Sequence, residues 1–417
     1  MDPEDVVATR LARYALTCDA RDLWPEVSVA AFRACQEAVA GVAAGVLAGS
    51  DVPVTLAPPR GADARALGIA AMAAGMGPLL GYWVEVGKVR TDPALAERLA
   101  VHLEHGRRRA ARMREELERV LAPLGERGIE LVVLKGLDTG YRYFPEPGTR
   151  PTADIDLLVK PTDRRAAGQV LSSLGFSEEQ SQQPQRGHWT LPSPGRVRSL
   201  EFAHADDPWH VDLHHSLDRK LAGGIVASVG ALAPADVQPF LGFALPAAVL
   251  SPVTLLAFLA IHTSSHFYAM SSGKLVELAL VIRRDFEGRQ ERWRAVGELL
   301  ARHGSARFAY PALSLAERLL PGLIDPGVLG ALRAATPSRL RRLVGGLDPG
   351  TAQRLHPYPL AELLVWAASP GQVIGAALRR IWPRTNQGFL SRRQVATIYR
   401  VRLFRTGIAL ARSLRLR

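Results

Sequence analysis

The sequence predicts an α/β (α+β) protein in which a minimal mixed sheet with helices is flanked by N- and C-terminal all-helical regions. Residues 1–126 are alanine-rich with apolar residues at helical spacing, short β-branched runs follow up to residue 214, and helical spacing returns after about 235. Hydrophobic residues make up 47% of the 417 residues and charged residues 22%. This is the balance of a globular chain long enough for two or three cores.

Residues 1–126 are predicted to form the helical N-terminal region. Its clearest helix begins at Asp92-Pro93, where a capping residue precedes a proline in the first turn. Later apolar residues of this helix recur at spacings of three and four and predict one buried stripe: Ala110, Met113, Leu117, Val120 and Leu124. The first residues of the chain are acidic, unlike the cationic start of a secretory signal, so we expect a cytoplasmic protein.

Residues 127–235 are predicted to hold the sheet. Apolar runs at 129–134 and 155–159 fit central strands, and a helix begins near Leu137. After the second of these strands, a helix is predicted between Thr162, which caps its start, and Gly175, which ends it. Further strands are predicted at 187–192, 196–204 and 209–214. Pro194-Gly195 forms the predicted turn between the first two of them.

Helices are predicted again in two C-terminal regions, 236–330 and 331–417. Ser251-Pro252 opens one helix, and a capping box that begins at Ser391 opens the last. The long uncharged stretch from Gln238 to Gly273 is interrupted by prolines, which predicts a buried helix and no transmembrane segment.

The net charge is concentrated in the C-terminal tail. Residues 371–417 contain eleven arginines and no other charged residue, whereas the whole chain carries +12. Such a tail could contact the phosphates of RNA, an anionic lipid surface or an acidic partner, or simply form a solvated helix face. The two cysteines, Cys18 and Cys35, exclude a disulfide framework and a four-thiolate zinc site, so a metal would be bound by oxygen or imidazole.

Two aspartates flank Ile155 in a predicted strand. Alternation in a strand places Asp154 and Asp156 on one face. Two close carboxylates repel each other unless a cation neutralises them, and oxygen ligands favour Mg²⁺ or Mn²⁺. The alternative is a solvent-facing strand end that binds no metal.

A second alternating segment adds a third carboxylate. His210, Asp212 and His214 share one face of the strand at 209–214. We expect this strand to lie antiparallel beside the Asp154-Asp156 strand, so that three acids on two strands support two cations for a phosphoryl or nucleotidyl displacement. The two histidines would orient carboxylates or substrate, or serve only the structure.

Lys135-Gly136 ends a strand and precedes a helix. Glycine permits close backbone approach, so an anion such as a triphosphate is expected there with Lys135 as its counter-charge, although a surface lysine is the alternative. Farther along, His262 and His266 have the spacing of a metal pair on a helix. They would bind zinc or provide a polar lining for an acceptor pocket or a helix interface.

These motifs resemble the signature of the uncharacterised nucleotidyltransferase-like family, a branch of the DNA polymerase beta-like nucleotidyltransferase superfamily. The resemblance covers about residues 120–290 and rests on four motifs: Lys135-Gly136, Arg150-Pro151, Asp154-Ile-Asp156 and Val211-Asp212-Leu213-His214. It implies the minimal nucleotidyltransferase sheet, metal binding by Asp154 and Asp156, and completion of the site by Asp212, which would help to activate an acceptor hydroxyl. Lys274 and Glu277 lie where the family often carries a basic and an acidic residue.

The chain departs from the superfamily at the phosphate-binding motif. A Gly-Ser pair usually precedes the first aspartate by about ten residues, whereas here Lys135-Gly136 takes its place and seventeen residues intervene. Phosphate binding by a serine is therefore lost. Lys135 and Arg150 are the candidates to replace it.

The resemblance implies a metal-dependent nucleotidyltransferase that uses Mg²⁺ or Mn²⁺ to transfer NMP from an NTP such as ATP to a hydroxyl acceptor. Residues 127–235 would form its catalytic core and 236–330 its acceptor side, and the acceptor could be a small molecule, peptide, protein or RNA. One alternative is an inactive protein of this fold that binds RNA or an acidic peptide through its arginine-rich tail. A glycosyltransferase that uses Asp-x-Asp is disfavoured, because no large doubly wound sheet is predicted.

Overall fold

The computed structural model describes residues 3–353, with gaps at 18, 180–185, 193–194, 222–223, 241 and 243–246, and a few residues between 365 and 375. The predicted capping box at Ser391 and almost all of the arginine-rich tail lie outside the described residues.

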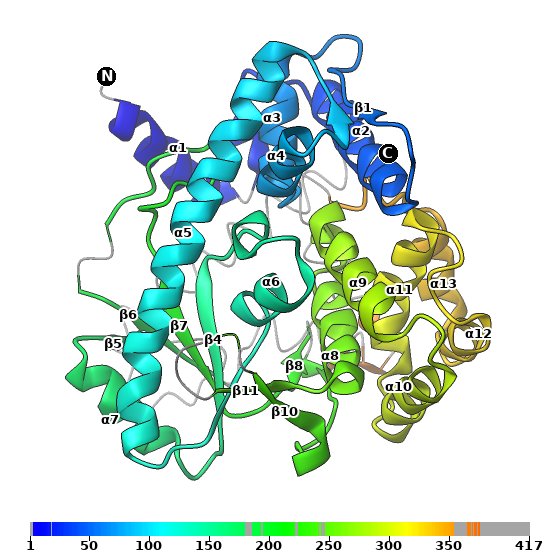
Figure 1. The fold of residues 1–417 in the computed structure, drawn as a ribbon. Helices are drawn as coiled ribbons and strands as arrows, with labels where there is room; N and C mark the ends of the chain where they lie inside the picture. Colours follow the sequence, from blue (N-terminus) through cyan, green and yellow to red (C-terminus); the bar gives the residue numbers. More distant parts are fainter. Residues whose placement is uncertain are drawn as a thin grey trace.

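The N-terminal region is mainly helical, as predicted. Its last helix, α5, begins directly after Asp92, whose Oδ1 accepts a hydrogen bond of 3.0 Å from the backbone N–H of Leu95. Four of the five residues of the predicted stripe are buried, and Figure 1 shows α5 running along one side of the molecule, from α3 and α4 down to the sheet. The helices are α1 (Pro3–Thr17), α2 (Val29–Leu47), α3 (Ala64–Ala73), α4 (Gly77–Glu85) and α5 (Pro93–Glu126), and a two-stranded pair, β1 (Val54–Thr55) and β2 (Val89–Arg90), accompanies them.

A seven-stranded mixed sheet forms the centre of the chain, with strand order β10-β11-β3-β4-β7-β6-β5. The central strands β3, β4 and β7 lie where the sequence predicts them. Helices α6 (Leu137–Tyr143) and α7 (Arg164–Ser173) are also close to their predicted places. The strands are β3 (Leu131–Val133), β4 (Asp154–Val159), β5 (Ser177–Glu179), β6 (Arg186–Thr190), β7 (His210–His214), β10 (Val237–Phe240) and β11 (Ala247–Leu250).

The expected antiparallel pairing of the two acidic strands is wrong. β4 and β7 are parallel, with Asp154 opposite His210 and Asp156 opposite Asp212. Helix α7 and the β5–β6 hairpin separate the two strands in the chain, and β7 runs antiparallel to β6, which returns it to the direction of β4. Opposed residues of neighbouring strands share a face in either orientation, so the acids still lie together.

The predicted strand at 196–204 is absent, and the end of this segment is bound by a side chain of α5. The buried guanidinium of Arg109, on α5, donates hydrogen bonds to the backbone carbonyls of His204, Asp207 and Pro208 at 2.9 to 3.3 Å. It also donates to the carbonyl of Thr152 at 2.6 Å. An irregular segment is thereby held against α5 without joining the sheet. A separate pair, β8 (Arg219–Lys220) and β9 (Val226–Ala227), follows β7.

Helices form the rest of the described chain after β10 and β11, two strands in a region predicted to be helical. The predicted buried helix is α8, which begins at Pro252 after Ser251, and most of its residues are buried. Beside α8 lie α9 and α11, and Figure 1 shows this bundle next to the sheet. The helices are α8 (Pro252–Ser265), α9 (Ser272–Asp285), α10 (Gln290–Arg302), α11 (Ala306–Leu319), α12 (Pro326–Ala334) and α13 (Ser338–Gly345).

Within the described part of the chain, α2 alone is long and apolar enough to cross a membrane, and α3 with α4 meet the same criterion only as a pair bent by 118°. In α2, 44% of the apolar window is buried inside the protein. Core helices of globular proteins have the same length and composition, so this observation assigns no membrane segment.

Candidate active site

The two faces of β4 and β7 differ sharply in chemistry. Ile155, Leu157, Val211 and Leu213 are at most 1% exposed and join a core with residues of α5 and α7. The side chains between them point to the opposite face, where they form a row of acids and imidazoles: Asp154, Asp156, His210, Asp212 and His214. The sequence alternation thus predicted the members of this row correctly.

The carboxylates of this row are close and buried. Asp156 is 1% exposed and Asp212 0%. One oxygen of each carboxylate and one ring nitrogen of His214 all lie within 4.8 Å of one another. This proximity and this set of donors suit a divalent cation, because buried carboxylates at such separations repel each other without a counter-charge.

Lys135 supplies one such counter-charge. Its ammonium contacts the carboxylate of Asp156 and lies 3.6 Å from Oδ2 of Asp154. Burial alone would raise the pKa of Asp156, but the positive charge of Lys135 and the hydrogen bond from His214 outweigh it and hold that pKa below its ordinary value. Burial likewise opposes the charge of Lys135, and the two aspartates raise its pKa overall. Lys135 therefore stays charged, paired with the acids.

The two histidines of β7 differ in their contacts. His214 is 5% exposed, and its Nε2 is hydrogen-bonded to Oδ1 of Asp156 at 2.9 Å. His210 is more open, with Nε2 at 3.8 Å from Asp212 Oδ1 and 4.0 Å from Asp154 Oδ2. Burial lowers the pKa of His210 despite the neighbouring carboxylates. His214 holds a carboxylate, whereas His210 lies at the solvent side of the row.

Arg150 pairs with an acid of the helical region. Its Nε and Nη2 donate to the two carboxylate oxygens of Glu277, on α9, at 2.8 and 3.3 Å. Burial opposes the charge of Glu277, but Arg150 keeps its pKa below the ordinary value, and Thr139 of α6 donates to the same carboxylate. Arg150 thus connects the segment before β4 with α6 and α9.

Gly136 shapes the turn between Lys135 and α6. Its φ of 81° lies in the left-handed region that favours glycine. A Cβ at this position would also come within 3.4 Å of Thr152 Cγ2 and 3.6 Å of Arg150 Nη1. Glycine lets the lysine enter the site and the chain turn at once into α6.

Cations border the acidic row on the helical side. Lys274, in the first turn of α9, has its pKa lowered to about 8 by burial and by the nearby charge of Lys135. Arg219 of β8 lies 3.3 Å from His266 Nε2 and 3.5 Å from Ser265 Oγ. The resemblance marked Lys274 only loosely, and Arg219 was missed, because nothing in its local sequence sets it apart from the chain's many arginines.

His188 was missed as well. It lies on β6 directly opposite Asp212, and its Nδ1 is 2.9 Å from Asp212 Oδ1. The strand predicted at 187–192 included this residue. Pairing that strand with the one at 209–214 would have brought His188 into the acidic row.

The predicted metal pair His262 and His266 has no third ligand in the described structure. Two groups of three potential ligands occur there, and both consist of residues of β4, β6 and β7. Helix α8 ends at Ser265, so His266 lies just after the helix, and the ring centroids of His262 and His266 are 5.7 Å apart. Burial, followed by the charge of Lys135, lowers the pKa of His262 well below its ordinary value, so this ring is neutral.

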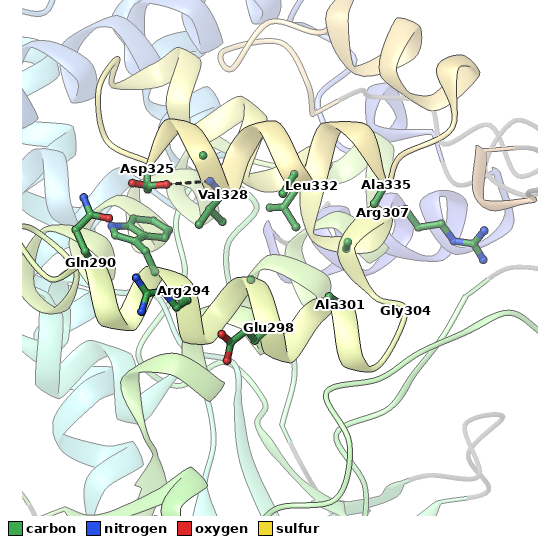
Figure 2. Close-up of a pocket in the computed structure, with 15 residues that line it drawn as sticks. Gln290, Arg294, Glu298, Ala301, Gly304, Arg307, Asp325, Val328, Leu332 and Ala335 are labelled. Carbon is green, nitrogen blue, oxygen red and sulfur yellow. Dashed lines mark hydrogen bonds between the residues drawn. The ribbon is translucent and has the colours of Figure 1, made fainter.

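A large groove lies elsewhere in the described structure, between α10 and α12 (Figure 2). Its volume is about 700 Å³, and Arg294, Glu298, Val328 and Leu332 are among the residues that line it. None of the acids of β4 and β7 borders it. Cavity size therefore does not identify the acidic row, which is marked by its chemistry.

One comparison with known proteins finds a family that covers this site. The model of a family described as "uncharacterised nucleotidyltransferase" matches residues 60–321. The match includes the acidic row, Lys135, Arg150, Glu277 and Lys274. No curated protein and no solved structure matches the chain.

Proposed function

The chain belongs to the uncharacterised nucleotidyltransferase family, and we propose that it catalyses metal-dependent transfer of NMP from an NTP such as ATP to a hydroxyl acceptor. The observation that carries this proposal is the register of β4 and β7, which sets Asp156 opposite Asp212 and Asp154 opposite His210 on one face. The availability of NTPs also leads us to propose a cytoplasmic location.

The donor set fits a divalent cation. Asp154, Asp156 and Asp212 offer carboxylate oxygens, the ligands that Mg²⁺ and Mn²⁺ prefer. When bound there, the cation would neutralise charge on the α-phosphate and align it with the acceptor oxygen. Asp154 and Asp156 would hold it, with His214 fixing the carboxylate of Asp156 through its 2.9 Å hydrogen bond.

The remaining steps belong to side chains of the protein. Asp212, buried between β4 and β6, accepts the proton of the acceptor hydroxyl as that oxygen attacks the α-phosphate. Lys135, whose ammonium contacts Asp156, would donate to the phosphate chain of the NTP when a cation neutralises that carboxylate. The bond between the α-phosphorus and the bridging oxygen of the pyrophosphate breaks as the new bond forms, and Lys274, which feels the charge of Lys135, would stabilise the negative charge of the pyrophosphate.

Lys274 and Arg219 bind the β- and γ-phosphates in this proposal. The low pKa of Lys274 reflects burial among other cations, including Lys135 and Arg219, with Glu277 as the acid that opposes the shift. A triphosphate would relieve that repulsion. Arg150 acts differently, because Glu277 already accepts from its guanidinium, and it positions α9 against the acids.

Labelled nucleotides test the proposal. Each NTP is incubated with the protein and Mg²⁺ or Mn²⁺, and label transfer and pyrophosphate release are compared among the wild type, Asp154→Asn and Asp156→Asn. We expect both variants to lose activity by a factor of about 10³ or more, because metal binding and charge neutralisation depend on these oxygens.

The matched control is Glu298→Gln, which removes an exposed carboxylate in the groove between α10 and α12. It should retain wild-type activity. Turnover in the aspartate variants equal to that of the wild type would reject a catalytic role for the acids. RNA binding that falls steeply with salt, without any nucleotide turnover, would favour the inactive RNA-binding alternative.

A further inference from the structure

Two imidazoles and a carboxylate form a second group of possible metal ligands. His188 of β6 and His210 and Asp212 of β7 each offer one ligand atom, and these atoms all lie within 4.8 Å of one another. The group is a consequence of strand register, because His188 lies opposite Asp212 and His210 lies opposite Asp154. β6 and β7 therefore present the three side chains on one face, beside Asp154 of β4.

The separations suit one metal centre. Metal–ligand bonds of about 2.1 Å place neighbouring donor atoms about 3.0 Å apart at right angles and about 3.4 Å apart in a tetrahedron. Here His188 Nδ1 lies 2.9 Å from Asp212 Oδ1, and His210 Nε2 lies 3.8 Å from the same oxygen. Asp154 Oδ2, at 4.0 Å from His210 Nε2, offers a fourth donor.

Exposure distinguishes these two rings from His214, and orientation distinguishes His210 as well. The side chains of His188 and His210 are 26% and 27% exposed, whereas that of His214 is 6% exposed and its ring is hydrogen-bonded to Asp156. The Nε2 of His210 points toward two carboxylates but lies beyond hydrogen-bond distance of both. A ring that served only to satisfy a carboxylate would be closer, as His214 is.

We propose that His188, His210 and Asp212 form a binding site for a divalent transition metal, with Asp154 as a further ligand. Imidazole ligands favour transition metals such as Co²⁺ or Zn²⁺, Mn²⁺ accepts imidazole beside carboxylates, and Mg²⁺ prefers oxygen ligands. The site shares Asp212 with the acidic row. The inference therefore rests on the proposed function in one respect, because it names the class of metal that would bind next to the carboxylates of the proposed reaction.

Metal binding is measured without any nucleotide. Co²⁺ is titrated into the full-length protein and followed by its visible absorption bands, and bound Mn²⁺ is examined by pulsed electron paramagnetic resonance for coupling to ¹⁴N. We expect nitrogen coupling in the wild type that weakens in His188→Gln and in His210→Gln, and a loss of Co²⁺ affinity of about tenfold or more in both variants. The exposed His303 supplies the matched control, His303→Gln, which should bind Co²⁺ as the wild type does.

The outcomes separate this inference from the proposed function. Wild-type protein whose bound Mn²⁺ shows no nitrogen coupling would overturn the inference, and this readout needs no variant to fold. Equal Co²⁺ affinity in the wild type and both glutamine variants would overturn it as well. Nitrogen-coupled metal, together with turnover that Asp154→Asn and Asp156→Asn match, would support the site and reject a catalytic role for the acids, whereas turnover that depends on the acids, without nitrogen coupling, would do the reverse.

Discussion

Lys135 gives the buried carboxylates their charge balance in the absence of a cation. Its ammonium contacts Asp156 and lies 3.6 Å from Asp154, and its side chain is only 11% exposed. Removal of one partner of a buried ion pair leaves an uncompensated charge, which is far more costly than loss of the pair itself. The stability of the folded chain should therefore depend on the positive charge of this lysine, and a bound cation should be able to supply that charge instead.

We expect Lys135→Met to lower the free energy of unfolding by about 3 kcal/mol, and Mn²⁺ to restore more stability to this variant than to the wild type. Urea denaturation with and without Mn²⁺ measures both effects. The control is Lys160→Met, because Lys160 pairs with Glu130 at the surface, with a side chain 61% exposed. Equal unfolding curves for the two variants would show that Lys135 does not balance the acids.

The pKa of Lys274 predicts how nucleotide binding varies with pH. Because this pKa is lowered to about 8 from an ordinary value of 10.5, the side chain is charged below pH 8 and loses its proton as the pH rises through that value. If Lys274 binds phosphate, the KM for NTP should rise above pH 8. Lys274→Arg, which stays charged, should remove this rise.

Lys274→Met should raise the KM by about tenfold or more at pH 7, since a charge-assisted hydrogen bond contributes about 1.5–3 kcal/mol. Steady-state kinetics across the pH range measures both effects. The exposed Lys88 provides a control in Lys88→Met, which should leave the KM unchanged. A KM profile in Lys274→Met that overlays the wild-type profile would exclude Lys274 from phosphate binding.

Residues of the site were predictable where strand alternation alone determines their side. The period of two assigned Asp154, Asp156, Asp212 and both flanking histidines to one face, and the structure agrees. The same pattern fits parallel and antiparallel pairing equally well, so strand direction was beyond its reach. The pairing of Arg150 with Glu277 joins residues 127 positions apart, and no local pattern carries such a contact.

At the scale of elements, helix α5 contributes more than its buried stripe. Arg109 is 6% exposed and donates to four backbone carbonyls, including that of Thr152, two residues before Asp154. These hydrogen bonds hold the irregular segment 195–209 and the entry to β4 against the helix. The backbone of this segment is thus bound by the side chain of Arg109, where a strand would be bound by a neighbouring strand.

We expect Arg109→Met to lower the free energy of unfolding by about 3 kcal/mol or more, since several buried carbonyls lose a charged donor. Hydrogen exchange followed by mass spectrometry should show faster exchange in peptides from 195–209 while α7 stays protected. Arg108→Met changes the exposed neighbour on the same helix and should alter neither measurement. Unchanged exchange in 195–209 would show that Arg109 does not hold this segment.

Helix starts were easier to predict than edge strands. The start of α5 follows from the capping aspartate and the proline after it, and both act within one turn. β10 lies in a region predicted to be helical, and it contains Pro239, a residue that strands tolerate mainly at the edge of a sheet. β10 does lie at that edge, a position that becomes visible only once the whole sheet is assembled.

At the scale of the whole molecule, the sheet and the helices after it form one site. Glu277 of α9 binds Arg150 and Thr139, and Asp285 of the same helix accepts a hydrogen bond of 2.7 Å from Tyr143. β10 and β11 also extend the sheet beyond the boundary predicted at residue 235. The regions predicted at 127–235 and 236–330 are therefore joined by these contacts and by the shared sheet.

The parallel register of β4 and β7 determines both the polar row and the apolar core behind it. If β7 slipped by a single residue, Val211 and Leu213 would replace the carboxylate and imidazoles on the polar side, and Asp212 would enter the hydrocarbon interior against α5 and α7. Such a slip would disrupt the polar face and the apolar face of these strands at the same time. A substitution at the rim of the site therefore changes one side chain, whereas a change of register alters the polar row and the apolar core together.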